Sequence, residues 1–62
     1  MTLLEWLRFK SLTQSEAASY LGITQPAVSL LCSGSRMPSL QMMQKIFVLT
    51  DGEVSMKDFV DE

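Results

Sequence analysis

Histidine is absent from this 62-residue sequence, and cysteine occurs once, at Cys32. Zinc sites are built from clustered cysteine and histidine ligands, and a disulfide framework needs paired cysteines. Histidine is also the most frequent general base near neutral pH. The sequence has no Ser/His, Cys/His or paired-carboxylate pattern either. We therefore expect no metal, no cofactor and no catalytic residue, and we do not expect an enzyme.

Long apolar runs are also missing. No stretch approaches the ~20 apolar residues that a membrane-spanning helix needs. The N-terminus does not have the basic and then apolar layout of a signal peptide. With the lone cysteine, these features predict a cytoplasmic protein without a membrane partner. The length predicts one domain, residues 1–62, which buries only about 60% of its unfolded surface.

Positive charge is scarce. Five Lys and Arg against seven Asp and Glu give a net charge of −2, which argues against a nonspecific nucleic-acid binder. The distribution is uneven, because residues 1–50 hold four cations and two carboxylates, whereas residues 51–62 hold one cation and five carboxylates. The acidic end is interpreted either as a solvated terminus that favours solubility or as a segment that points away from a polyanion.

Capping signals precede five predicted helices. A Thr or Ser followed three residues later by an acidic side chain forms a capping box, and a lone Thr or Ser also caps a helix. These residues are Thr2 with Glu5, Thr13 with Glu16, Thr24, Ser39 after Pro38, and, more weakly, Ser55 with Asp58. The predicted helices cover about residues 3–10, 14–21, 25–32, 40–50 and 56–60, with Gly34 and Gly52 ending the third and fourth.

One segment has two interpretations. Asp51-Gly52 lies between apolar runs, which is a hairpin signal. The run 40–45 consists of good helix formers, however, and a helix places Leu40, Met43 and Phe47 on one stripe against helices 3–10 and 25–32. We favour the helix, and the hairpin across residues 45–56 is the alternative.

Residues 14–34 carry the most informative spacing. Ala18 allows two helices to approach closely, Gly22 follows where the chain turns into a left-handed conformation, and Val28 points back into the helix pair. Apolar residues at spacings of three and four flank the turn. The pattern predicts a helix-turn-helix at about residues 14–32, which places its second helix in the DNA major groove.

The stretch from Leu12 to Gly34 resembles the phage repressor and Cro group, the Xre family. The run Thr24-Gln25-Pro26-Ala27-Val28-Ser29 is typical of the start of that family's DNA-reading helix. Residues 36–40, 50–54 and 58–59 are similar to small Cro-like and YdaS-like regulators. The resemblance implies an all-α, lambda-repressor-like DNA-binding domain of four to five short helices around a central helix-turn-helix.

The DNA-contacting residues are expected at the front of the motif. The Gln25 amide can bond N6 and N7 of adenine, and Ser29, one turn on, can contact a base or a phosphate. Thr24 is expected to cap the helix and touch a phosphate, and Pro26 and Ala27 to meet a thymine methyl group. On the alternative interpretation, Gln25 and Ser29 are ordinary exposed residues of the helix.

Further contacts are expected around that helix. The resemblance implies that Gln14 bonds a phosphate, and helix N-termini favour anions, which supports the same role for Ser15. Arg36 is expected on the DNA backbone. Leu30 departs from the family pattern, which has a polar or basic residue there, so it either contacts methyl groups or meets another protein.

We therefore predict a transcriptional regulator, a Cro-like repressor, that binds double-stranded DNA. So small a domain makes few contacts, which predicts a homodimer on a palindromic operator with half-sites about 34 Å apart. The alternative is a protein-interaction module or antitoxin-like regulator with a protein partner. Self-association is also expected from apolar residues beyond what a single stripe can bury: Met42, Val48, Met56 and Val60. Helical spacing assigns Trp6, Phe9 and Tyr20 to the core or an interface, and Cys32 to the core.

Overall fold

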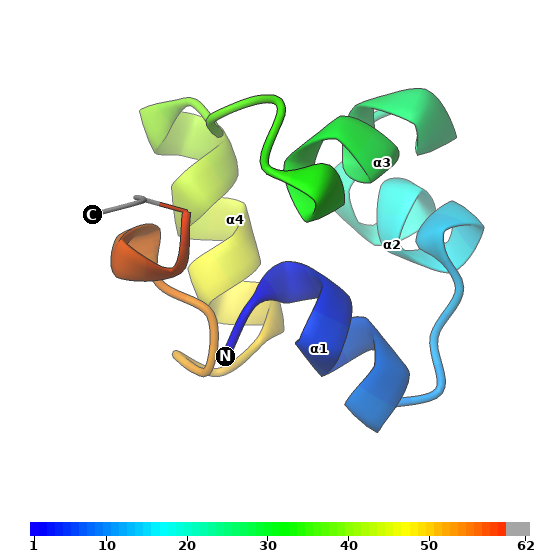
Figure 1. Ribbon diagram of the computed structural model, residues 1–62, viewed down its shortest axis with the longest axis horizontal. Coiled ribbons are helices and arrows are strands. Elements are labelled where there is room, and N and C mark those ends of the chain that lie inside the picture. The colour runs from blue at the N-terminus through cyan, green and yellow to red at the C-terminus, as the bar shows by residue number, and fades with distance from the viewer. Residues whose placement is uncertain (60–62) are drawn as a thin grey trace.

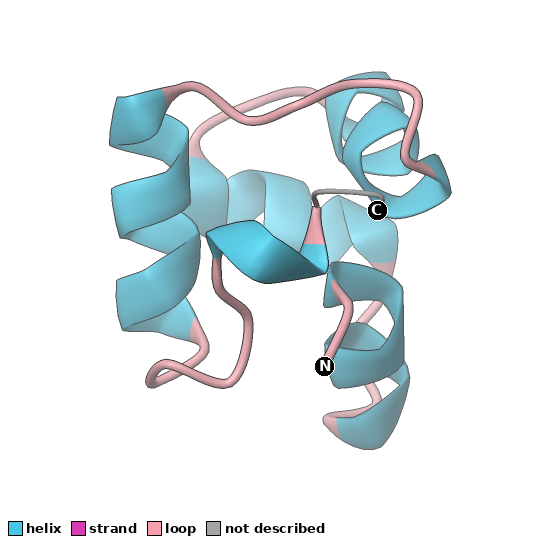
Figure 2. Cartoon of the chain, turned by 60° about the vertical axis from the view of Figure 1, so that its left-hand side comes forward, coloured by secondary structure: helices cyan, strands magenta, loops and turns pink. Residues whose placement is uncertain are grey.

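Four α-helices and one 3₁₀ turn make up the chain in a computed structural model that describes residues 1–59. They are α1 (Leu3–Phe9), α2 (Gln14–Leu21), α3 (Gln25–Ser33), α4 (Leu40–Leu49) and η1 (Met56–Asp58) (Figure 1). No strand occurs among the described residues, as Figure 2 shows. The all-α prediction is confirmed, and the hairpin alternative across residues 45–56 is wrong.

The α-helices begin at the predicted capping residues. The hydroxyls of Thr2 and Thr13 accept from the amides of Glu5 and Glu16 at 3.2 and 3.1 Å, and both carboxylates accept in return at 2.9 Å. The Thr24 hydroxyl caps α3 in the same way, because it accepts from the amide of Ala27, three residues further on. Each such cap stabilises its helix by about 0.5–2 kcal/mol. Local hydrogen bonding therefore sets where these helices start.

The end of α4 differs from the prediction. The helix ends at Leu49 with Thr50 as its C-cap, and Gly52 lies beyond it with φ of +82°. The buried Thr50 hydroxyl donates to the carbonyl oxygen of Ile46 at 2.8 Å and accepts from the amide of Val54 at 3.1 Å. A side chain, rather than the glycine alone, therefore directs the chain out of α4.

The predicted last helix is only one 3₁₀ turn, η1. The amides of Asp58 and Phe59 donate to the carbonyl oxygens of Ser55 and Met56, three residues back. The Asp58 carboxylate accepts from the Ser55 amide at 2.9 Å, as expected for the weak capping signal. The segment therefore closes in the tighter helical geometry of short connections. Val60 lies outside the described residues.

The core is built from one face of each α-helix. Its fully buried centre includes Ala17, Val28, Ile46 and Val54, each with 0% exposure. The α2–α3 pair makes the most extensive helix contacts, while α1 packs on α3 and α4 on α2. The remaining buried apolar residues are Leu3, Trp6, Leu7, Ala18, Leu21, Leu31 and Met43.

The inward face of α4 differs from the predicted one. Met43 and Ile46 are buried, whereas Leu40 is 73% and Phe47 51% exposed. The predicted stripe was therefore wrong for Leu40 and Phe47, because α4 packs chiefly against α2 and is rotated about its axis. An apolar row is left facing outward.

The three aromatic residues expected in the core or at an interface divide between these two places. Trp6 is a core residue, whereas Phe9 is 71% and Tyr20 67% exposed, so for these two only the interface expectation is left. Cys32 is only partly buried, although it packs against the core. Helical spacing alone did not distinguish the inward face from its neighbours in these short helices.

Candidate nucleic-acid interface

The turn between α2 and α3 has the geometry that the spacing predicted. Gly22 has φ of +72°, and the amide of Ile23 donates to the carbonyl oxygen of Ala18 at 3.0 Å. A Cβ built on Gly22 would meet nothing within 4 Å. Glycine is therefore required there for its backbone conformation, not for space. Ala18 and Val28 are buried, as expected for residues at the contact between the helices.

One face of α3 is open to solvent. Its exposed residues recur at helical spacing: Gln25, Pro26, Ser29, Leu30 and Ser33. Val28 and Leu31 on the opposite face are buried in the core. The apolar side of α3 is therefore fixed in the core. Its exposed side presents uncharged side chains, most of them polar, to solvent or to a binding partner.

Gln25 and Thr24 begin this exposed face. The Gln25 side chain makes no hydrogen bond with any residue of the described part, so both polar ends of its amide are unoccupied. The Thr24 oxygen accepts from the Ala27 amide at 3.3 Å. Its hydroxyl hydrogen can therefore still be donated to an acceptor such as a phosphate oxygen.

The first turn of α2 brings Gln14 and Ser15 to the surface. Ser15 is exposed and Gln14 is half-buried. Their backbone amides lie at a helix start, where intrahelical acceptors are lacking. The Glu16 carboxylate is also in this turn, engaged by the Thr13 amide at 2.9 Å. It adds a negative charge close to the residues expected to bind phosphate.

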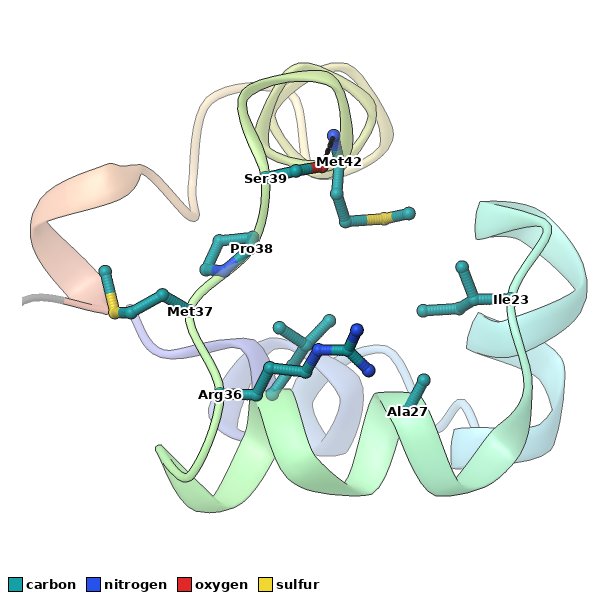
Figure 3. Close-up of a pocket in the computed structure, with 8 residues that line it drawn as sticks. Ile23, Ala27, Arg36, Met37, Pro38, Ser39 and Met42 are labelled. Atoms are coloured by element: carbon teal, nitrogen blue, oxygen red, sulfur yellow. Dashed lines mark hydrogen bonds between the residues drawn. The ribbon is translucent and has the colours of Figure 1, made fainter.

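Arg36 lies in the loop after α3, as predicted, but its side chain takes an unexpected course. Figure 3 shows it running back along α3 toward Ala27. It enters a cavity of about 270 Å³ between α3, α4 and the loop that joins them. The residues lining this cavity are Ile23, Ala27, Leu31, Arg36, Met37, Pro38, Ser39 and Met42.

This cavity was not predicted from the sequence, and its lining includes the half-buried Ala27, which was expected to meet a thymine methyl group. Ile23, Ala27 and Leu31 recur at a spacing of four along the α3 side, which was the available signal. The opposite wall of the cavity is formed by the loop and by α4. Its distance from α3 depends on tertiary packing, which the sequence pattern does not give.

Charges around α3 are few. The one ion pair among residues 1–59 joins the Met1 amino group and Asp58 at 3.1 Å. Arg36 has no carboxylate partner within this part of the chain.

Desolvation by burial raises the pKa of the Cys32 thiol, which keeps it neutral at pH 7 and unsuited to nucleophilic chemistry.

The helices of residues 1–59 are too short and insufficiently apolar for any of them to span a membrane.

Comparison with known proteins gives a family match. The helix-turn-helix family model HTH_3 matches residues 9–54, from the end of α1 to beyond α4. The matched region includes both helices of the motif and the loop that carries Arg36. No significant match was found among curated proteins or among solved structures.

Proposed function

The chain belongs to the HTH_3 helix-turn-helix family of DNA-binding regulators, and from this premise we propose that it is a Cro-like repressor that binds a palindromic operator as a homodimer. The observation that carries the proposal is the open face of α3. Gln25 and Ser29 project from a helix whose other side is locked into the core by Val28 and Leu31. A rigid helix with free polar side chains is what base reading in the major groove requires.

Base reading is assigned to the first two turns of α3. Gln25 bonds adenine through both ends of its amide, and Ser29 contacts the next base or its phosphate. Pro26 and Leu30 offer apolar contact to thymine methyl groups. These four residues lie on the exposed face, and the buried Val28 between them sets the direction of that face.

Phosphate contacts hold α3 in register. Gln14 and Ser15 supply them from the start of α2, Thr24 from the cap of α3, and Arg36 from the following loop. Arg36 is the only cationic side chain among these four residues. Binding by one copy is therefore weak, and its salt dependence is shallow.

Two copies compensate for the few contacts of one. The exposed row on α4 includes Leu40, Phe47 and Val48, the last 79% exposed. Of the apolar residues expected to aid association, Val48 and Met56 are exposed and Met42 is partly buried. A standard interface of about 800 Å² per partner would take about a fifth of the 4238 Å² surface. We expect the dimer to be weak in solution and to form mainly on DNA.

Selection of bound fragments from a random duplex pool tests this function directly. Enrichment of an inverted repeat with half-sites about one helical turn apart is the expected result. Failure to enrich any sequence, at low as well as physiological salt, would contradict it.

The protein-interaction alternative, which includes an antitoxin-like regulator, has its own support. Leu30 is 42% exposed on the face where related proteins carry a polar or basic residue, and the net charge is −2. On this alternative Leu30→Ser abolishes a protein complex, while Gln25→Ala leaves every interaction of the chain unchanged.

A further inference from the structure

The cavity beside α3 combines apolar walls with one positive charge. Ile23, Ala27 and Leu31 line its α3 side, and Pro38 and Met42 line the side of the loop and α4. In Figure 3 the Ile23, Ala27 and Met42 side chains face the space into which Arg36 extends. The lining contains no acidic residue.

The charge of Arg36 is uncompensated within the described part of the chain. Its guanidinium has neither an ion pair nor a hydrogen bond there. Another hollow, beside Lys10, is different because Asp51 and Glu53 line it as well. A planar guanidinium with free donors is matched in shape and charge by a carboxylate, which it binds through two parallel hydrogen bonds.

We propose that this cavity is a binding site for a small carboxylate with an apolar body, held by Arg36 at its anionic end. The size fits such a molecule. An apolar cavity of about 150 Å³ admits benzene, so about 270 Å³ admits two fused rings. Two or three apolar side chains on each wall would cover the rings, while the open side would leave the carboxylate near the guanidinium.

The site is coupled to DNA through Arg36, a step that rests on the proposed function. The same guanidinium is assigned to a phosphate in the DNA complex, and it cannot neutralise both anions. The ligand and DNA therefore compete, and each lowers the affinity for the other by the same factor. In this arrangement the ligand acts as an inducer that releases the repressor.

The binding step is tested on the free protein with 1-naphthylacetate and its neutral isostere 1-naphthylacetamide. Calorimetry is expected to show that the acid binds about tenfold more tightly or better, because a hydrogen bond to a charged group contributes at least that factor. Amide chemical-shift changes are expected at Ile23, Ala27 and Met42. Equal affinities, or shifts centred elsewhere, would overturn the proposal.

Three variants assign the contacts. Arg36→Gln should lower the affinity for the acid to that for the amide. Lys45→Gln removes a cation outside the cavity and should change neither of the two affinities. Ala27→Leu fills the cavity and should weaken both probes alike, with an unchanged fold shown by circular dichroism. An Arg36→Gln protein that binds the acid as wild type does would contradict the assignment by itself, because this surface substitution leaves the core intact.

The coupling is tested on a duplex obtained by selection. Naphthylacetate should displace the protein, naphthylacetamide should not, and Arg36→Gln should remove the difference. If no duplex is bound under any condition, the proposed function fails while calorimetry still decides the cavity. If the acid binds free protein without weakening the DNA complex, the competition through Arg36 is wrong.

Discussion

The Thr50 hydroxyl accepts a hydrogen bond from the Val54 amide at 3.1 Å, so the side chain at the end of α4 holds the segment that follows. Both residues are buried, with 1% and 0% exposure. The hydroxyl also donates to the carbonyl oxygen of Ile46 at 2.8 Å. The Thr50 side chain thereby provides the acceptor for the buried Val54 amide, which lies outside any helix.

Replacing Thr50 with Val should therefore destabilise the protein. The shape is kept, but the Val54 amide is left buried without an acceptor, which costs about 1–3 kcal/mol. Thr50→Ser, which keeps the oxygen, serves as the matched control and should lose less. Urea denaturation followed by circular dichroism measures both, and equal midpoints for wild type and Thr50→Val would show that water replaces the bond.

Ala18 should not tolerate a large side chain. It is 6% exposed at the contact of α2 with α3, and leucine there would overpack the contact at a cost of about 1–3 kcal/mol. In a domain of this size each kcal/mol lowers the melting temperature by about 4–8 °C. Ser19→Leu, at the next and exposed position, is the control. A melting curve for Ala18→Leu that matches the control would mean that the helices do not meet there.

Trp6 should be replaceable by Phe at a modest cost. The side chain is 5% exposed, and its buried indole Nε1 has no hydrogen-bond partner within residues 1–59. Phe keeps most of the apolar volume and removes the unsatisfied donor, so a loss below about 1.5 kcal/mol is expected. Trp6→Ala should lose about 3–5 kcal/mol. A loss for Trp6→Phe as large as that for Trp6→Ala, measured by chemical denaturation, would contradict this prediction.

The order and the first residues of the α-helices were predictable because their signals are local. Thr2, Thr13 and Thr24 cap the helices that follow them, and Gly22 supplies the one backbone conformation that the turn requires. The outward position of Phe47 was not predictable, since it depends on how α4 is rotated against α2. Gln25, Pro26, Ser29 and Leu30 lie on the exposed face of α3, whereas the Arg36 side chain lies in the cavity between α3 and α4. The DNA-binding roles of all these residues stay predictions.

The outward row on α4 should promote self-association on DNA. Val48 is 79% exposed and has no core role, so Val48→Lys should leave the melting temperature within a few degrees of wild type. It should also reduce the cooperativity of binding to the selected palindrome, because two like charges would meet across a two-fold axis. Sedimentation and binding isotherms measure this. Unchanged cooperativity would place the interface elsewhere, and one-copy stoichiometry on the palindrome would contradict the dimer.

Gln25 and Arg36 form a contrasting pair, because one is assigned to a base and the other to a phosphate. Gln25→Ala should lose about 1–3 kcal/mol on the preferred site and relax preference at one base pair, with little change in the salt slope. Arg36→Ala should weaken binding to all duplexes alike and lower the slope by about one phosphate per copy.

The two signatures differ in kind and do not depend on absolute affinity, so the net charge of −2 does not obscure them. Lys45→Ala, which removes a cation from α4, is the control for a nonspecific effect of charge, and it should change the slope less than Arg36→Ala. Binding isotherms distinguish Gln25→Ala, Arg36→Ala and Lys45→Ala. They are measured at several salt concentrations, on the selected site and on its single-base variants. If both Gln25→Ala and Arg36→Ala bind every duplex as wild type does, α3 does not read DNA, and its exposed face with Leu30 is then a protein-binding surface.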